Sequence, residues 1–230
     1  MSRRRLSTAV LLTAAWMAAP RDSLAAPIFQ FHSGGLGATG VSTEEAYRRQ
    51  DPAFAIAINI FVGIRFFSDQ PIVIDRVGGH FLGFEGGDTF FAAIVQLDGE
   101  QDLPDSSDLS TPDVLATSIL HWPTLSAEVF ADMSIQLAPG WHAVIFGSGL
   151  FGAEGNGAAM ANAAEPLSSG YISWQPIVPA PGWYDVAPLE HNYRFVVEGR
   201  VVPEPRAAAL AAALLAAGGV SRRRCGWPRR

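Results

Sequence analysis

The chain contains no lysine and only one cysteine. Its 16 basic residues are all arginine, and the cysteine, Cys225, lies in the extreme C-terminal tail. The chain before that tail can therefore form no internal disulfide and no cysteine-based metal site. Its stability must come from the packing of a hydrophobic core.

Positive charge is also scarce in the middle of the chain. Between residues 27 and 206 there are seven arginines and 21 carboxylates, which gives this stretch a formal charge of −14. Such a surface repels polyanions, so nucleic acid is excluded as a partner on electrostatic grounds.

Histidine pairs with the spacing of a zinc site are missing as well. The 5 histidines form no H-x-H or H-x-x-x-H arrangement, so no zinc site can be assigned. Each histidine is expected to be structural, and the sequence indicates no cofactor. They are His32, His80, His121, His142 and His191.

Hydrophobic and aromatic residues, by contrast, are plentiful. The chain is 49% hydrophobic with 14 Phe and 6 Trp, which is typical of a folded protein and not of a disordered one. Removing a signal at each end would leave residues 27–201, about 175 residues, the size of one ordinary domain.

The hydrophobic pattern of this domain predicts strands. Residues 54–67 alternate aliphatic residues with small or polar ones, which places Ile58, Ile60 and Val62 on one face of a strand. Clusters of Gly, Pro, Asp and Ser, such as Gly78-Gly79, predict the turns. We expect an all-β fold, a single jelly-roll-like β-sandwich, with short helices possible over 44–50 and 158–164. Further strands are predicted over 71–77, 89–97, 114–121, 129–137, 141–146, 170–175 and 193–201.

The N-terminal residues 1–26 are typical of an export signal. Arg3, Arg4 and Arg5 precede an apolar run over 6–19, and small residues follow at 23–26. This order of a basic region, an apolar region and a small-residue site predicts a signal peptide that is cleaved after residue 25 or 26.

The C-terminal residues 202–230 have a different three-part order. Pro203, Glu204 and Pro205 precede an apolar run over 207–220, and a basic cluster follows. Fourteen helical residues span about 21 Å, against about 30 Å for a hydrocarbon core, so the run suits a transient transmembrane anchor. The basic residues, which would stay in the cytoplasm, are Arg222, Arg223 and Arg224.

This tail resembles the PEP-CTERM sorting signal, in which a Pro-Glu-Pro motif, a membrane helix and an arginine cluster are recognised by a membrane protease of the exosortase type. The resemblance covers about the last thirty residues. It implies a bacterium that makes exopolysaccharide, processing near Pro203, Glu204 and Pro205, and a final location in the cell envelope or the extracellular biofilm matrix.

A glycine-rich segment matches the sequence motif of a dinucleotide-binding site but not the secondary structure that the site requires. Gly147, Gly149 and Gly152 satisfy G-x-G-x-x-G after a predicted strand. The fingerprint needs a helix and a second parallel strand, whereas further glycines and a proline-bearing loop follow here. We predict a glycine-rich turn at the edge of a sandwich.

Two surface features are candidate binding sites. Asp98, Glu100 and Asp102 begin a carboxylate-rich loop that could supply oxygen ligands to calcium, although the loop lacks the EF-hand order and a solvated loop is the alternative. Aromatic residues cluster later, where a sugar ring could stack on them; the alternative is that they fill the core. These aromatic residues are Tyr171, Trp174, Trp183 and Tyr184.

No catalytic constellation stands out, so we expect a protein that is not an enzyme. The expected function is that of an exported surface or matrix protein, sorted by an exosortase-like enzyme and either structural or interacting with polysaccharide. The alternative is a secreted carbohydrate-active hydrolase on a jelly-roll scaffold, because sandwiches carry both lectins and enzymes.

Overall fold

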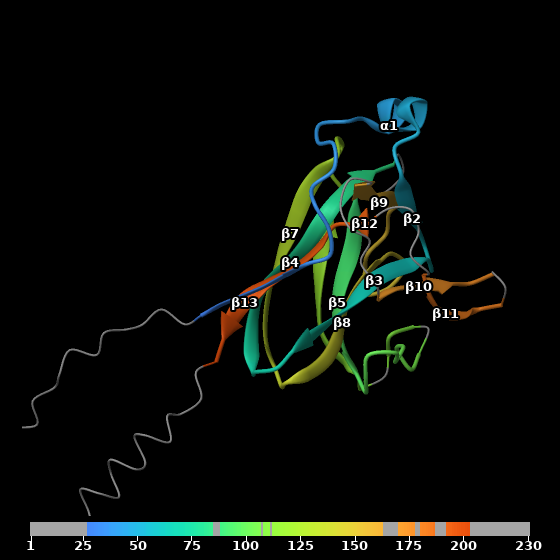
Figure 1. The fold of residues 1–230 in the computed structure, drawn as a ribbon. Helices are drawn as coiled ribbons and strands as arrows, with labels where there is room; N and C mark the ends of the chain where they lie inside the picture. The colour runs from blue at the N-terminus through green and yellow to red at the C-terminus, as the bar shows by residue number, and fades with distance from the viewer. Residues whose placement is uncertain are drawn as a thin grey trace, which may run out of the picture.

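The computed structural model describes residues 27–84, 88–106, 108–110, 112–162, 170–177, 180–186 and 192–202 (Figure 1). The predicted signal peptide over 1–26 and almost all of the predicted sorting segment over 202–230 lie outside these ranges, as do both predicted terminal helices. Within the ranges, no helix is long and apolar enough to cross a bilayer.

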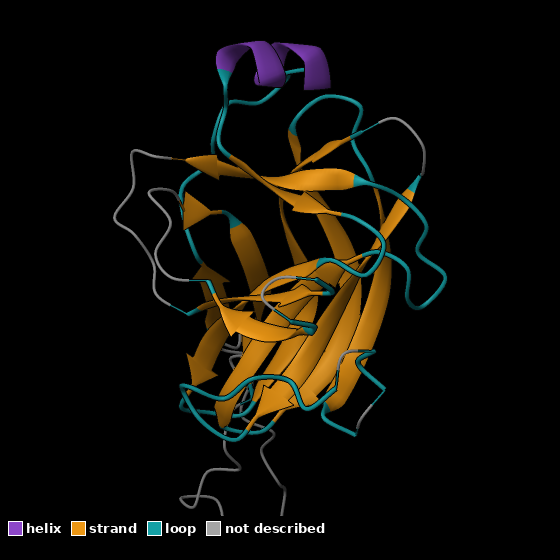
Figure 2. Cartoon of the chain, turned by 90° about the vertical axis from the view of Figure 1, so that its right-hand side faces the viewer, coloured by secondary structure: helices purple, strands orange, loops and turns teal. Residues whose placement is uncertain are grey.

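Two antiparallel sheets pack together, so the predicted all-β, sandwich-like fold is confirmed (Figure 2). In the described residues, one sheet has six strands in the order β11 (Gly182–Asp185), β10 (Tyr171–Gln175), β3 (Phe61–Ser68), β8 (Gly140–Gly147), β5 (Thr89–Leu97) and β6 (Val114–His121). The other has seven: β1 (Ile28–His32), β13 (Phe195–Val201), β4 (Ile72–Gly83), β9 (Gly157–Asn162) and β12 (Asn192–Tyr193), with β2 (Ala53–Ile56) beside β9 and β7 (Ala127–Leu137) beside β4.

The single strand predicted over 54–67 is wrong, because the chain passes from one sheet to the other within it. β2 belongs to the seven-stranded sheet and β3 to the six-stranded sheet. Asn59 between them has a left-handed backbone with φ 62°, and Ile58 is 58% exposed. Alternation with a period of two continues through the break, which is why the pattern alone does not reveal it.

The turn predicted at Gly78-Gly79 is also wrong. β4 continues through both glycines, with β7 on one side and β13 on the other. A Cβ at Gly79 would collide with the backbone oxygen of Arg194. These glycines therefore allow close approach of backbones inside a sheet.

The helix predicted over 44–50 is present as α1 (Thr43–Arg49). The helix predicted over 158–164 is wrong, because residues 158–162 belong to strand β9. The hydroxyl of Ser42 caps α1 by accepting a hydrogen bond from the amide of Glu45 at 3.2 Å. Ala46 is the only residue of α1 that is buried. The helix thus buries one small side chain against the sandwich, and the hydroxyl of Thr43 donates a hydrogen bond to the carbonyl of Gly83 at 2.9 Å.

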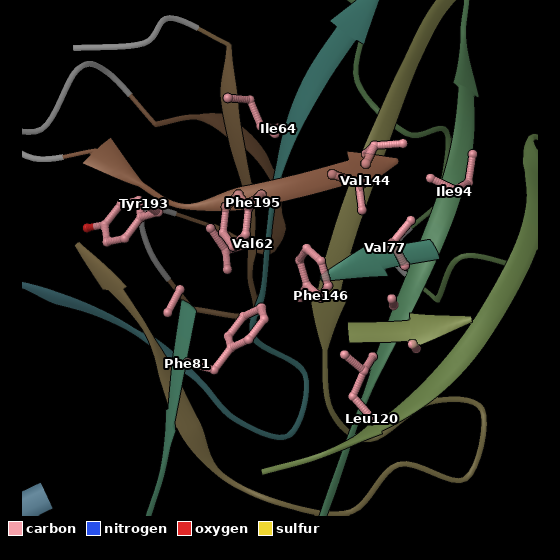
Figure 3. Close-up of a cluster of buried hydrophobic side chains, with 14 of the residues drawn as sticks. Val62, Ile64, Val77, Phe81, Ile94, Leu120, Val144, Phe146, Tyr193 and Phe195 are labelled. Carbon is pink, nitrogen blue, oxygen red and sulfur yellow. The ribbon is translucent and has the colours of Figure 1, made fainter. Parts of the chain in front are cut away.

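The space between the sheets is filled by large aromatic and aliphatic side chains. The rings of Phe146 and Phe195 stack at 5.1 Å, and Phe81 lies 5.0 Å from Phe146 (Figure 3). All three side chains are fully buried. Because rings of this size each bury a large apolar area, this cluster is the main source of stability.

The six-stranded sheet also buries part of its outer face. Phe61, Phe91, Ile145 and Ile172 form a second cluster there, and the loop over 98–113 packs on it through residues that include Leu109. Both faces of these strands are therefore covered, which explains why they read as nearly continuous apolar runs.

The two ends of the described chain lie side by side. β1 pairs antiparallel with β13, and the amide of Val201 donates a hydrogen bond to the carbonyl of Pro27 at 2.8 Å. The first and last described residues therefore leave the sandwich at the same edge (Figure 1).

Candidate functional site

The acidic loop and the late aromatic hairpin, which are far apart in the sequence, meet on the outer face of the six-stranded sheet. The indole Nε1 of Trp183 donates a hydrogen bond to the carbonyl of Ser106 at 2.9 Å, across 77 positions of the chain. The green loop and the orange hairpin can be followed to this point in Figure 1. The two predicted surface features thus form one region.

Trp174 and Trp183 form a pair at the centre of this region. They are directly opposite each other in the β10–β11 ladder, with their ring centroids 5.9 Å apart and their planes at 61°. The ring of Trp183 also lies 6.2 Å from Phe61 in the second cluster. Both tryptophans are half-buried, so each ring is held by apolar contacts and keeps part of its surface in solvent.

The two predicted tyrosines take different positions. Tyr171 is 3% exposed and lies on the core side of β10, where its hydroxyl donates a hydrogen bond to the carbonyl of Tyr193 at 2.7 Å. Tyr184 is half-buried, and its hydroxyl contacts the backbone of Ala180 in the hairpin turn. Tyr171 therefore packs in the core between the sheets, on the other side of β10 from Trp174, whereas the Tyr184 side chain contacts the turn of the hairpin.

Arg65 joins the hairpin to the loop and was missed by the sequence analysis. Its guanidinium Nη1 lies 2.6 Å from Oδ1 of Asp185 on β11, and its Nε donates to the carbonyl of Asp102 at 2.7 Å. Its side chain is only 3% exposed. A charge is almost never buried unless it is paired, so a lone arginine within an apolar strand was the signal that could have indicated this contact.

The carboxylates of the loop accept hydrogen bonds largely from other residues of the same loop. Oδ2 of Asp102 accepts a hydrogen bond from the amide of Asp98 at 2.7 Å, while the side chain of Glu100 is exposed. Hydrogen bonds from the hydroxyl and the amide of Ser110 lower the pKa of Asp108. Among the residues described, no group of three or more His, Cys, Asp or Glu could hold a metal ion.

A small depression nevertheless opens beside these carboxylates. It has a volume of about 220 Å³. Carboxylate oxygens in such a place accept hydrogen bonds from hydroxyl groups. Its lining is Gln96, Asp98, Asp102, Asp105, Pro112 and Asp113.

The glycine-rich segment forms the predicted turn. Gly147 ends β8, which has antiparallel neighbours on both sides, and a Cβ there would collide with Phe61 and Phe91. Gly149 and Gly152 follow with φ 90° and 82°, a backbone that favours glycine. The glycines thus serve packing and turn geometry.

Two histidines lie in the interior, away from this region. Burial lowers the pKa of both His80 and His142. The ring of His142 stacks on Phe66 at 5.6 Å, and neither ring nitrogen of His80 has a hydrogen-bond partner among the described residues. Both are therefore neutral core side chains near pH 7.

In comparisons with known proteins, no family matches this chain and no curated protein matches it. The predicted sorting motif Pro203, Glu204 and Pro205 and the basic cluster at 222–224 lie outside the described residues.

Proposed function

We propose that this is an exported, non-enzymatic surface or matrix protein that binds polysaccharide through the outer face of its β10–β11 hairpin. The single observation that carries the proposal is the pair of half-buried tryptophans, Trp174 and Trp183, at the edge of a sheet. Aromatic rings that are held in place and partly exposed offer flat apolar faces on which a sugar ring stacks.

The surroundings of the pair support a neutral glycan over a charged one. The body carries a formal charge of −14 between residues 27 and 206, which repels polyanionic chains. Asp98, Asp102 and Asp105 line the neighbouring depression and offer acceptors to sugar hydroxyls. The ligand class is therefore a polysaccharide rich in hydroxyl groups and poor in carboxylates or sulfates.

The contacts that join the hairpin to the loop support a binding role for this region. Arg65 ties Asp185 of the hairpin to the backbone of Asp102 in the loop, and Trp183 bonds the loop a second time. A surface that is ordered before its ligand arrives loses less conformational entropy on binding.

The route of the protein to this location follows from its ends. We propose export by the signal peptide, a transient hold by the short apolar tail, and processing near Pro203-Glu204-Pro205 by an exosortase-like enzyme. The adjacent ends of β1 and β13 support it, since cleavage at both sites would leave a trimmed sandwich. From β2 to β5 and again from β6 to β10, successive strands lie in alternate sheets, which supports a jelly-roll-like topology.

Glycan binding is tested with exopolysaccharide purified from the native host and with neutral dextran as a second probe. Trp174→Ala and Trp183→Ala should each weaken binding about fivefold, since an aromatic contact contributes about 1 kcal/mol. Phe67→Ala is the matched control, because Phe67 is 51% exposed but about 20 Å further along β3 from Phe61. Equal binding by all variants would remove the hairpin from the proposal, and release of reducing sugars would favour the hydrolase.

Sorting is tested separately by the intact mass of the protein from its native host. Deleting the exosortase gene should leave an unprocessed, membrane-held form. An identical mature mass with and without the gene would refute the sorting claim and leave the glycan claim standing.

A further inference from the structure

A second cavity lies beneath α1 and is lined in part by that helix. The helix sits at one end of the sandwich (Figure 2). Its volume is about 650 Å³, within the range of small-molecule sites. Strands β2, β4 and β9 and the helix itself supply its walls. The proposed glycan surface uses none of these residues.

The cavity exists because small side chains meet there. Ala46 is the only residue that α1 buries, and Ala53 on β2 and Ala158 on β9 face the same space. Leu82 and Met160 complete the apolar lining and are both almost fully buried. A helix that buries only one alanine does not fill the space below it, so an apolar hollow remains.

One polar group in the lining lacks a partner. Oδ1 of Asp51 lies 3.2 Å from Nη2 of Arg49, but its enclosed Oδ2 has no hydrogen-bond partner in the described part of the chain. A carboxylate oxygen without a donor is costly to bury. Because the terminal torsion of an aspartate is soft, a small rotation would bring this oxygen to a ligand in the cavity.

The other charge in the lining is already used. Arg48 is held by the carboxylate of Glu45, with Nε at 2.9 Å from Oε2 and Nη2 at 2.6 Å from Oε1. The guanidinium of Arg48 is therefore not available to bind an anion. The Oδ2 oxygen of Asp51, by contrast, can accept a hydrogen bond from a ligand. Tyr47, which is 87% exposed, and Phe84, which is 37% exposed, add ring faces that attract cations.

We propose that this cavity binds a small organic cation with an apolar body, such as an aryl or alkyl ammonium compound. The apolar part lies on Leu82, Met160 and Ala158, and the ammonium group donates to Asp51. The acidic body favours such a ligand at long range as well.

The test uses benzylamine as the probe and benzoate as its matched anion, with binding followed by NMR shifts of the Leu82 and Met160 methyl groups. A ligand of this size should bind with a dissociation constant on the order of 1 mM. Asp51→Asn should weaken binding at least fivefold. Arg49→Gln should tighten it, because it removes the cation that competes for Asp51.

A steric pair of variants checks the location. Ala53→Phe should abolish binding by filling the cavity, whereas Ala138→Phe, in the exposed turn between β7 and β8 and outside the lining, should leave it unchanged. Thermal unfolding confirms that each variant is folded. The proposal is overturned if benzoate binds as well as benzylamine, if Asp51→Asn binds benzylamine as tightly as the parent, or if no saturable shifts occur.

Discussion

The guanidinium of Arg65 lies 2.6 Å from the carboxylate of Asp185, yet the two side chains are buried to very different degrees. Arg65 is 3% exposed and Asp185 is 57% exposed. Loss of Arg65 therefore leaves an exposed carboxylate. Loss of Asp185 leaves a buried cation without a counter-ion, hydrogen-bonded only to the backbone carbonyls of the loop.

This asymmetry predicts unequal effects of two substitutions. Asp185→Ala should lower the free energy of unfolding by about 2 kcal/mol, less than for a fully buried pair because solvent reaches the carboxylate. Arg65→Met should cost less, since an apolar side chain of similar size fits the second cluster. Urea unfolding of both variants measures the difference, and a larger loss for Arg65→Met would contradict this account.

The aromatic core predicts a large effect at Phe146. Phe146→Ala removes a ring that stacks on Phe195 and should cost about 3–5 kcal/mol. Phe67→Ala, at a ring that is half in solvent, should cost less than about 1 kcal/mol. Denaturant midpoints at a constant m-value give both numbers; equal losses would show that Phe146 is not part of the stabilising core.

The buried histidines predict a loss of stability in mild acid. Burial lowers the pKa of His80 by more than the nearby Glu128 raises it, and Arg194 lowers it further. Burial also lowers the pKa of His142. The unfolded chain then binds protons at higher pH than the folded one, so stability is complete above about pH 6.5 and falls as the pH drops below it.

The measurement is the urea midpoint between pH 8 and pH 5. Replacing His142 with Phe, which keeps the stack on Phe66, should flatten the decline. An unchanged slope in both His142→Phe and His80→Gln would assign the decline to other groups.

Gly157 should resist substitution because of Trp122. A Cβ at Gly157 would lie 2.6 Å from the carbonyl oxygen of Leu82 and 2.5 Å from two ring atoms of Trp122, so Gly157→Ala should destabilise the protein by about 1–3 kcal/mol. Gly99→Ala is the control, because nothing lies within 4 Å of the added carbon. Similar midpoints for both variants would contradict the close packing of Trp122 on Gly157.

Local sequence patterns predicted correctly those strands that pair with the same neighbouring strands along their whole length. β5 and β6 have the predicted bounds, because breakers flank each of them. The prediction of one strand over 54–67 was wrong because the change from one sheet to the other depends on tertiary contacts. The prediction of a helix at β9 was wrong because its alanines favour a helix, whereas pairing with β2 and β4 makes this segment a strand.

The two parts of the candidate site were predicted separately, but not that they lie together. The sequence indicated Trp174 and Trp183 as aromatic and the loop at 98–113 as acidic, each by composition. Their meeting through Ser106 and Arg65 depends on long-range pairing of β3 with β10, which no local pattern encodes.

The pairing of β13 with both β1 and β4 has a mechanical consequence. Hydrogen bonds between strands run perpendicular to the strand axis. Tension applied at Val202 along β13 would therefore load the bonds to both neighbours together, in shear, instead of opening them one at a time. A chain held by its C-terminal end would therefore be pulled in the direction in which the sheet resists unfolding most strongly.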